Sequence, residues 1–537
     1  MRYDVVVVGG GAAGLAAAAY ASRAGLTVAL LEQQPRLGGL VQSVNRDGFI
    51  FDMGLRAIEN AGIVLPMLEE LGLSLDYVRS PVSLGIEDTI ITLESQESIA
   101  AYRNLLVNHY PDSSRDVDRI IALIRKVMKD MDVLYGIDNP LFRAPARDRR
   151  YLVRTLLPWL VRFPFTIQRI NRMAGPVEAL LETLTGDSAL RSIIGQHFFK
   201  GTPAFFAMSY FSVYLDYLYP RGGTGALTAL LADHIRAAGV DIQCETMVVA
   251  VDPDAGTVGD RTGRVWSYAN LIWCADLKTL YRSIGPATIR DAGLRRSVAA
   301  RRQQIEPCPG ADSVLSLFLA VDQPPGYFRA ISHGHLFYTP DSRGLGDLHT
   351  TQLETLLAQC RGGERGATQE AVRAYLERYF ELTTYELSIP ALKDPAMAPE
   401  GKTGVIVSTL FDYRLARLAR DEGWHDDLTS FCANAVTAVL SSRLYPALRD
   451  KVVSRFVTSP VTIEERTGNS DGAIVGWSFT SPTMPAVHEM QRVARSVITP
   501  LPRVFQAGQW TYSPAGLPMA FLTGKLAANR VRRNLRG

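Results

Sequence analysis

The chain has 537 residues, of which 47% are hydrophobic and 21% are charged, and its formal net charge is +3. This composition is typical of a globular protein with two or three domains, and so small a net charge gives no reason to expect a nucleic-acid partner. The five cysteines lie far apart and no CxxC pair or histidine cluster accompanies them, so neither a disulfide framework nor a metal site is predicted.

The N-terminus runs directly into YDVVVVGGG, without the charged and apolar regions of a signal peptide. No run of about 18 apolar residues is free of charges, as a membrane-spanning helix would require. We therefore expect a reducing, cytoplasmic setting.

The N-terminal stretch YDVVVVGGGAAGLAAAAYASRAGLTVALLEQ predicts a strand, a helix and a second strand. Its β-branched run, residues 5–8, is typical of a parallel strand buried on both faces, and the alanine-rich run that follows forms helices readily. Between them stand Gly9, Gly11 and Gly14, in the GxGxxG spacing that brings a pyrophosphate to a helix N-terminus. Glu32 ends the second strand, where a carboxylate suits the ribose hydroxyls of a dinucleotide. We predict a dinucleotide site with an unmodified adenosine ribose, because Glu32 would repel a 2′-phosphate; the alternative is a glycine turn without a ligand.

The next stretch, QPRLGGLVQSVNRDGFIFDMG, contains a Gly-Gly pair and a strand that ends in Asp-Met-Gly. This pattern resembles the FAD-dependent amine-oxidase superfamily, in which both features lie beside the flavin. The resemblance implies FAD as the cofactor, and it adds these residues to its expected contacts: Gly38, Gly39, Leu40, Gly54 and Leu55. Leu40 stands where the family usually has arginine, so one phosphate contact is expected from the backbone or from Arg36. For the Gly-Gly pair, the alternative is an ordinary loop.

The middle of the chain contains three stretches that differ in residue composition. Residues 57–140 are predicted to be mostly helical, because their apolar residues recur at helical spacing. Residues 143–172 interleave arginines with Trp159, Phe163 and Phe165, which favours peripheral contact with the inner face of a membrane. The alternative is a solvated helix face, and RNA binding has no other support in the chain. The stretch at 197–220 is dense in aromatic residues, which predicts either core packing or the wall of a long apolar pocket.

Residues 219–276 begin with YPRGGTGALTALLADHIRAAGVDIQCETMVVAVDP and end in an Asp after a strand. This part resembles phytoene desaturases and carotenoid isomerases, which are members of the same superfamily. The resemblance implies that the strand TMVVAV returns to the dinucleotide domain and that a backbone group near Val248 holds the adenine. It also implies a polyene or isoprenoid lipid as substrate, with desaturation by hydride transfer to the flavin N5 atom.

We predict an α/β fold with a Rossmann-type FAD-binding domain, a mixed α+β substrate domain and a helical insertion. The FAD-binding domain is expected to be discontinuous and to comprise residues 1–80, 219–285 and 495–537. Residues 81–218 are the insertion, facing substrate and membrane, and residues 286–494 supply the sheet and helices of the substrate domain. A second nicotinamide-binding domain is not expected, because no other GxGxxG follows a strand.

The C-terminal stretch VFQAGQWTYSPAGLPMAFLTGKLAANRV predicts a strand, a glycine turn and a helix. The resemblance implies that this segment returns to the FAD domain and completes the flavin site. Gly508 allows close backbone approach, while Gly516 and Leu517 open a helix whose free N–H groups would face the flavin. Gln509 stands where many flavoproteins have an aspartate.

The chain has no nucleophile elbow and no metal-ligand spacing, so its chemistry is expected to rest on the cofactor. His333 and His335 alternate along a predicted strand, which favours one exposed and one satisfied histidine over a ligand pair. Arg56 is the candidate polar residue beside the flavin ring, with a salt-bridged surface arginine as the alternative, and no general base is predicted. Other functions left open are a flavin-dependent saturase or cis–trans isomerase of a polyene, a flavin amine oxidase, and a non-catalytic FAD-bound interaction protein.

Overall fold

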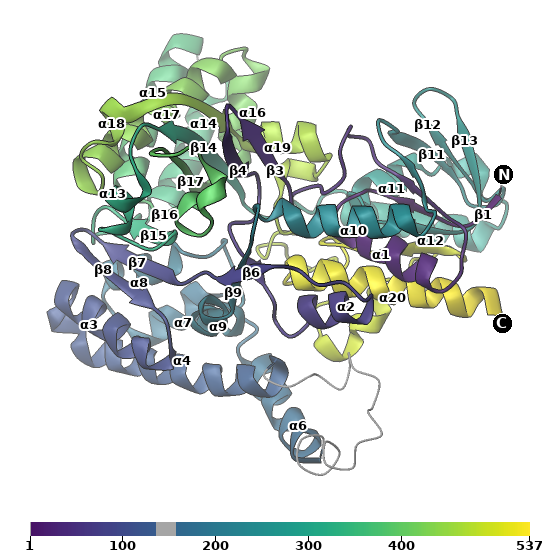
Figure 1. The fold of residues 1–537 in the computed structure, drawn as a ribbon, viewed down its shortest axis with the longest axis horizontal. Helices are drawn as coiled ribbons and strands as arrows, with labels where there is room; N and C mark the ends of the chain where they lie inside the picture. Colours follow the sequence, from purple (N-terminus) through teal and green to yellow (C-terminus); the bar gives the residue numbers. More distant parts are fainter. Residues whose placement is uncertain (1, 136–156, 363, 537) are drawn as a thin grey trace.

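The computed structural model describes residues 2–135, 157–362 and 364–536. Two seven-stranded sheets form the frame of this part of the chain (Figure 1). In the first sheet the order is β10-β2-β1-β13-β12-β11, and β19 also pairs with β13. Its strands are β1 (Arg2–Val8), β2 (Val28–Leu31), β10 (Asp241–Gln243), β11 (Val248–Asp252), β12 (Thr257–Asp260), β13 (Val265–Trp273) and β19 (Val504–Gln506).

The first sheet is buried on both faces, as the β-branched run of β1 predicts. Val5 and Val7 belong to one core and Val6 and Val8 to another, because successive side chains of a strand point to opposite faces. Side chains of β1 and β2 pack on one face with helices α1 (Ala12–Arg23), α2 (Val64–Glu70), α10 (Gly225–Ala237) and α20 (Leu517–Arg536). Two helices pack on the other face, α11 (Leu277–Ser283) and α12 (Ala292–Ile305).

The second sheet has the order β18-β14-β17-β16-β15-β7-β8. Its strands are β7 (Val82–Ile86), β8 (Thr89–Leu93), β14 (Ser313–Val321), β15 (His335–Thr339), β16 (Tyr385–Ser388), β17 (Thr403–Phe411) and β18 (Val452–Thr458). Leu315 and Leu317 point into a core shared with the helices on one face, whereas Ser316 between them lines a cavity on the other. The nearby helices are α13 (Pro325–Arg329), α14 (Leu353–Cys360), α15 (Arg365–Leu382), α16 (Tyr413–Asp421), α17 (His425–Arg443), α18 (Leu448–Lys451) and α19 (Pro460–Thr467).

A helical layer lies below the second sheet in Figure 1. It contains α3 (Ile99–His109), α4 (Ser114–Tyr135), α6 (Leu157–Arg172), α7 (Val177–Leu184), α8 (Ser188–Gly195) and α9 (Ala204–Leu215). Two small sheets connect the parts: β3 (Ser43–Arg46) with β4 (Phe49–Asp52), and β5 (Ile58–Glu59), β9 (Tyr217–Pro220) and β6 (Tyr77–Arg79) in the order β5-β9-β6. The predicted α/β fold is confirmed.

The prediction that residues 57–140 are mostly helical is confirmed for α2, α3 and α4, which occupy much of residues 64–135. It missed β5, β6, β7 and β8, which lie between residues 58 and 93, and residues 136–140 lie outside the described part of the chain. β7 pairs in parallel with β15, a strand far downstream, and antiparallel with β8. Tertiary pairing with a distant strand therefore decides this segment rather than local helical spacing.

No helix within residues 2–135, 157–362 and 364–536 is both long enough and apolar enough to cross a bilayer.

Candidate functional site

A cavity of about 540 Å³ extends from the first sheet to the second. At one end it is lined by Val8 and Leu31, the last residues of β1 and β2, and by the glycine turn that follows β1. At the other end it is lined by side chains from β15, β16 and β17. In α/β sheets, ligands bind outside the carboxyl ends of parallel strands, so the first end is where a dinucleotide would lie.

The two glycine turns face each other at this end. Gly11 and Gly38 form an isolated parallel bridge, and a Cβ at Gly39 would lie 3.1 Å from the Gly11 Cα. Gly9, Gly11, Gly38 and Gly39 all line the cavity. Gly14 has a packing role, because a Cβ there would lie 1.8 Å from the Gly9 carbonyl oxygen. Bare backbone therefore forms the floor on which a pyrophosphate would rest.

Helix α1 begins at this floor without a side-chain cap, since its N-cap is Gly11. An uncapped helix N-terminus offers backbone N–H groups and the positive end of the helix dipole to an anion. Glu32 lines the cavity beside it, and its carboxylate accepts hydrogen bonds from the N–H groups of Gly10 (2.6 Å) and Gln34 (2.8 Å). The predicted pyrophosphate and ribose positions are thus adjacent, as one dinucleotide requires.

The remaining predicted contacts from the first half of the chain also line the cavity: Arg36, Leu40, Gly54, Leu55 and Val248. Gly54 must be glycine, because a Cβ there would lie 2.0 Å from the Leu40 carbonyl oxygen. Leu40 and Gly54 therefore pack backbone against backbone, which leaves no room there for a side chain on Gly54.

The C-terminal segment completes the same wall. Gly508, Gln509, Gly516 and Leu517 line the cavity, and α20 begins at Leu517 as predicted. Gly508 has φ +99°, a backbone conformation that favours glycine, and its N–H donates to the Thr523 hydroxyl at 2.9 Å. Every predicted cofactor contact except Gly14 thus lines one cavity, while contact with FAD itself stays a prediction.

Asp52, in the Asp-Met-Gly stretch, has a structural role. Its buried carboxylate accepts hydrogen bonds from the hydroxyls of Tyr219 (2.6 Å) and Ser43 (2.7 Å) and from the Thr224 N–H (2.7 Å). A carboxylate with these partners ties β4 to the turn that precedes α10. That turn carries the Tyr-Pro-Arg-Gly-Gly sequence by which the family resemblance was recognised.

Arg56 lies in the cavity wall and is buried, so the alternative of a salt-bridged surface arginine is wrong. Its guanidinium donates to the Asp52 carbonyl oxygen and to the Ser408 hydroxyl (2.8 Å). Burial lowers the pKa of Arg56, and the nearby carboxylates of Glu386 and Asp52 oppose this effect. A second, half-buried cation, Lys393, donates to the Arg56 carbonyl oxygen at 2.8 Å, and desolvation lowers its pKa to about 7. The sequence analysis missed Lys393.

The aromatic stretch at 197–220 serves both of its predicted purposes. Along α9, Phe206, Tyr210 and Tyr214 recur every fourth residue and line the cavity. Phe211 and Met208, on another face of the helix, belong to the hydrophobic core beneath. Spacing of four residues places side chains on one helix face, so α9 presents an aromatic wall to the cavity and an apolar face to the core. The part of the cavity lined by Phe206, Tyr210 and Tyr214 is called the aromatic chamber below.

Two carboxylates face this aromatic chamber, and the sequence analysis missed both. Glu59 ends β5 and Glu386 lies within β16. Glu386 accepts a hydrogen bond from His335 Nε2 at 2.9 Å, and the Tyr217 hydroxyl lies 3.4 Å from Glu59 Oε1. The one local signal was Glu386 itself, a charged residue inside the short strand Tyr-Glu-Leu-Ser. Nothing local marks Glu59.

The two carboxylates differ in protonation. Burial raises the pKa of Glu59 to about 7, although the Tyr217 hydrogen bond opposes the shift. Burial acts on Glu386 too, but the hydrogen bond from His335 and the cations Arg56 and Lys393 hold its pKa below the usual value. One carboxylate is therefore a fixed negative charge at neutral pH, and the other titrates there.

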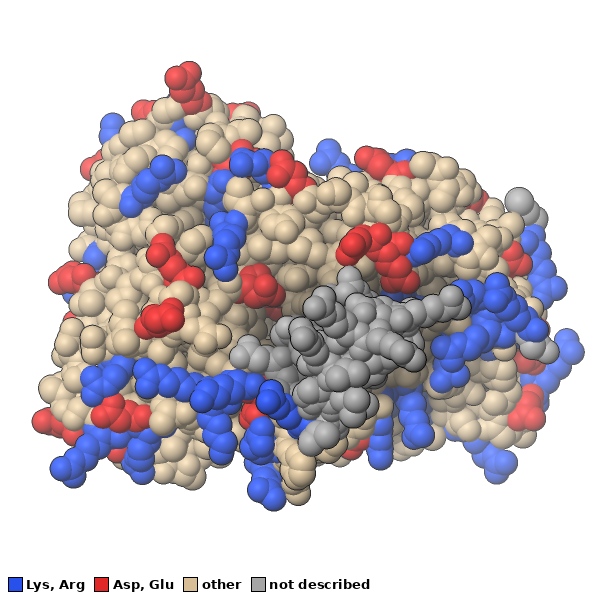
Figure 2. All heavy atoms as spheres, turned by 60° about the horizontal axis from the view of Figure 1, so that its bottom comes forward, with Lys and Arg blue, Asp and Glu red and all other residues tan. Residues whose placement is uncertain are grey.

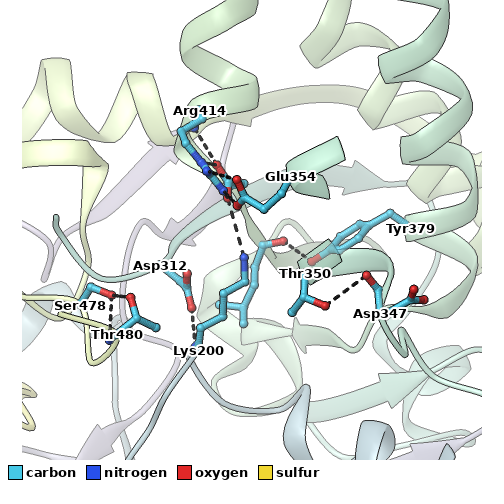
Figure 3. A network of polar contacts seen from close by, with 11 residues as sticks. Lys200, Asp312, Asp347, Thr350, Glu354, Tyr379, Arg414, Ser478 and Thr480 are labelled. Atoms are coloured by element: carbon cyan, nitrogen blue, oxygen red, sulfur yellow. Dashed lines mark hydrogen bonds and ion pairs between the residues drawn. The ribbon is translucent and has the colours of Figure 1, made fainter. Parts of the chain in front are cut away.

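Figure 3 shows a network of polar contacts that includes Lys200, Asp312, Glu354 and Arg414. Behind the chamber lies a smaller cavity of about 40 Å³, and three residues line both: Gln196, Phe198 and Leu410. Next to it, the Lys200 N–H donates to Asp312 at 2.6 Å and the Lys200 ammonium lies 3.8 Å from Asp412. Arg414 bridges Asp412 and Glu354. These pairs fasten the segment after Phe198 to the second sheet.

The prediction for the two alternating histidines is confirmed. His333 is exposed, whereas His335 is buried and bonded to Glu386. Among residues 2–135, 157–362 and 364–536, no group of three or more His, Cys, Asp or Glu side chains could hold a metal ion.

The arginine-rich segment is only partly described. Arg143, Arg147, Arg149, Arg150 and Arg154 lie outside the described residues. On α6, Arg162 and Arg172 are exposed, and Phe165 is 61% exposed. Figure 2 shows basic side chains gathered along the face where α4 and α6 lie. Arg125, Lys126 and Lys129 of α4 are exposed.

The chain is similar to known proteins in both sequence and fold. Residues 12–532 match the family model for flavin containing amine oxidoreductases. The chain is 20% identical to a phytoene desaturase of Fusarium fujikuroi, over 99% of this chain and 90% of that protein. It is 23% identical to an all-trans-retinol 13,14-reductase of Macaca fascicularis, over 99% of this chain and 86% of that protein. Among solved structures, wild-type putrescine oxidase bound to putrescine shares the fold, with a TM-score of 0.57, 15% identity and coverage of 99% of both chains.

Proposed function

This chain belongs to the family of flavin containing amine oxidoreductases, and we propose that its substrate is a polyene or isoprenoid lipid, which it desaturates. It is an FAD-dependent oxidoreductase, so a hydride acceptor is available within the protein. The observation that carries the substrate proposal is the aromatic chamber, which is continuous with the glycine-lined end of the cavity. A long apolar molecule would reach the flavin through that chamber.

The residues that would hold FAD fit its chemistry. Uncapped N–H groups at the start of α1 would bind the pyrophosphate, and the Glu32 carboxylate would accept hydrogen bonds from the ribose hydroxyls. Gly516 and Leu517, at the start of α20, would meet the flavin ring, where the helix dipole favours negative charge. When bound, FAD supplies a two-electron acceptor for hydride.

The protein's own residues would then orient the substrate and keep water away. Phe206, Tyr210 and Tyr214 form a wall that binds an apolar chain without directional contacts. Arg56 would lie beside the reacting end of the chamber, held by the Ser408 hydroxyl and the Asp52 carbonyl oxygen. Its position is set by buried partners, so it would act as a fixed positive group.

Delivery from a membrane is the second part of the proposal. The exposed Phe165 and the exposed Arg162 and Arg172 make α6 suited to lie at a lipid surface. The basic residues of α4 extend the same face (Figure 2). A polyene has negligible solubility in water, so an enzyme that takes it up benefits from such contact.

Extraction of the purified protein with organic solvent, followed by mass spectrometry, tests the substrate class. We expect an apolar polyene or isoprenoid lipid from the wild type and none from Phe206→Arg, which puts a charge in the chamber. The control is Val453→Arg, a substitution at a residue that is 55% exposed, which should keep the lipid. Recovery of no lipid, or of an amine, would contradict the proposal.

The same chamber suits hydride transfer in either direction, so saturation or isomerisation of a polyene requires no other site. A second candidate, oxidation of an amine, is favoured by one observation: Glu59 and Glu386 both face the chamber and could bind an ammonium group. Incubation with diamines and polyamines in air, with peroxide as the readout, separates the two. The lipid proposal predicts no peroxide above background, and rapid peroxide formation would favour the amine.

A further inference from the structure

Glu59 occupies a special position in the chamber. It lies at the end of β5, and a Cβ added at Gly516 would lie 3.8 Å from its Oε2 atom. Gly516 directly precedes α20, the helix whose start would meet the flavin. Glu59 also lines the cavity. Its carboxyl group is therefore next to the place where, under the proposed function, flavin and substrate meet.

A chain of contacts joins Glu59 to Glu386, which lies in β16 and also lines the cavity. The Tyr217 hydroxyl lies 3.4 Å from Glu59 Oε1, a long hydrogen bond. The Tyr217 ring stacks on the His335 ring, with centroids 5.3 Å apart and planes at 18°. His335 in turn donates from Nε2 to Glu386 at 2.9 Å. A hydrogen bond and a ring stack therefore fix the two carboxylates relative to each other.

The charged groups around the two carboxylates are unequal. Glu386 is near two cations, Arg56 and Lys393, and it also accepts the His335 hydrogen bond. Glu59 faces the Tyr217 hydroxyl and the negative charges of Asp216 and Glu386. Glu386 therefore keeps its charge, while Glu59 has neighbours that allow it to gain and lose a proton.

We infer that Glu59 is a catalytic residue that exchanges a proton with the substrate, and that Glu386 is the fixed negative charge that faces it. The inference rests on the proposed function, because it requires a reaction in which hydride and proton leave neighbouring carbons. A catalytic carboxyl group needs contact with the substrate and a pKa near the working pH. The position of Glu59 in the cavity beside Gly516 would provide the contact, and the groups around Glu59 set its pKa.

One C–H bond of the substrate breaks with both electrons leaving as hydride, which the oxidised FAD accepts. The neighbouring C–H bond gives its proton to the Glu59 carboxylate, and the electron pair of that bond becomes the second bond of the new C=C. Glu59 then releases the proton to water. In the saturating direction, neutral Glu59 would give a proton to the double bond and hydride from the reduced FAD would complete the addition.

The first test does not require a substrate. Infrared difference spectra of the FAD-loaded protein should show a carboxylic-acid C=O band that disappears as pH rises through about 7. The band should be absent in Glu59→Gln and present in Glu386→Gln and in Glu69→Gln, a control at an exposed residue of α2. Persistence of the band in Glu59→Gln would overturn the inference.

The second test is the pH profile of anaerobic flavin reduction by a polyene. In the wild type the rate should rise with pH through about 7, because the base must be ionised. Glu59→Gln should lose the rise and at least about a hundredfold of the rate, while Glu59→Asp, which folds with the same charge, should keep a titrating profile. Wild-type rate and profile in Glu59→Gln would refute the role of Glu59. If no polyene reduces the wild-type flavin, the proposed function fails. The infrared test needs no substrate, so it still reports whether Glu59 titrates near pH 7.

Discussion

Arg56 and Lys393 place two cations beside two carboxylates, Asp52 and Glu386. Arg56 and Asp52 are buried, and buried charges are stable only with partners. The carboxylates of Asp52 and Glu386 stabilise both cations electrostatically, while Lys393 donates to the Arg56 carbonyl oxygen and Arg56 donates to the Asp52 carbonyl oxygen. Removal of any one would leave an uncompensated charge, so the group behaves as a unit. This explains why Arg56 can lie in the cavity wall without a direct ion pair to a carboxylate.

The raised pKa of Glu59 predicts that the stability of the protein depends on pH. Its pKa is raised from 4.5 to about 7, so the folded state holds its proton more tightly than the unfolded chain does. Stability should therefore be highest below the unfolded pKa and fall as pH rises through the window up to about 7. Glu59→Gln removes this loss, so thermal unfolding should show a variant more stable than the wild type by roughly 1–3 kcal/mol above pH 7, with the difference vanishing at acidic pH.

The control for this measurement is Glu69→Gln, at an exposed position of α2, which should follow the wild type at every pH. A Glu59→Gln variant whose melting temperature tracks the wild type from acidic to alkaline pH would show that Glu59 is not a buried, titrating group.

At the residue scale, the sequence predicts positions whose chemistry is local. Gly9 and Gly508 adopt φ values near +100°, a backbone conformation that favours glycine, and the glycine spacing in the surrounding sequence predicts such turns. Glu59 and Glu386 could not be found in this way. They are joined through Tyr217 and His335, which lie far from both in the chain, so only the tertiary fold brings the four together.

Among elements, the pair α1 and α20 decides how the two ends of the chain meet. A Cβ at Gly524 of α20 would lie 2.4 Å from the Ala13 carbonyl oxygen and 3.1 Å from the Ala16 Cβ. The alanines of α1 and the glycine of α20 thus allow the helices to approach closely. This contact sets the start of α20 against the cavity wall.

Gly524→Ala should therefore destabilise the protein by about 1–3 kcal/mol, because the added methyl group has no space, and should weaken FAD binding. The control is Gly366→Ala in α15, where a Cβ would meet nothing within 4 Å; it should leave stability unchanged or slightly raised. Denaturant unfolding and flavin fluorescence measure both effects. Equal behaviour of the two variants would argue against tight α1–α20 packing.

The element scale also shows where sequence patterns fail. The strand–helix–strand unit at the N-terminus and the final helix were predicted, because each is specified by its own residues. β7 and β8 were not, although Glu87 between them has φ +52° and marks a tight turn. Their place in the second sheet depends on the pairing of β7 with β15. The spacing of apolar residues within β7 and β8 does not predict this pairing.

On the scale of the whole molecule, the cavity joins the two sheets and the basic face of α4 and α6 lies on the outside (Figure 2). We expect the protein to sediment with vesicles containing anionic lipid. Reversal of charge in Arg162→Glu with Arg172→Glu should lower binding by at least about tenfold, since each basic residue near an anionic surface contributes about 1 kcal/mol. Arg302→Glu, an exposed position on α12, is the control and should bind as the wild type does.

Equal binding of all these proteins to anionic vesicles would contradict a membrane face at α6, as would loss of binding in the control alone.

Desaturation of a polyene by this protein is tested most directly by the absorption spectrum of the FAD-loaded protein, mixed without oxygen with a polyene hydrocarbon in detergent micelles. We expect the oxidised-flavin bands to bleach at a rate that depends on polyene concentration, and a product with one more double bond to be recovered in proportion to the flavin reduced. Flavin bands that stay unchanged with every polyene, while an amine bleaches them, would contradict this expectation.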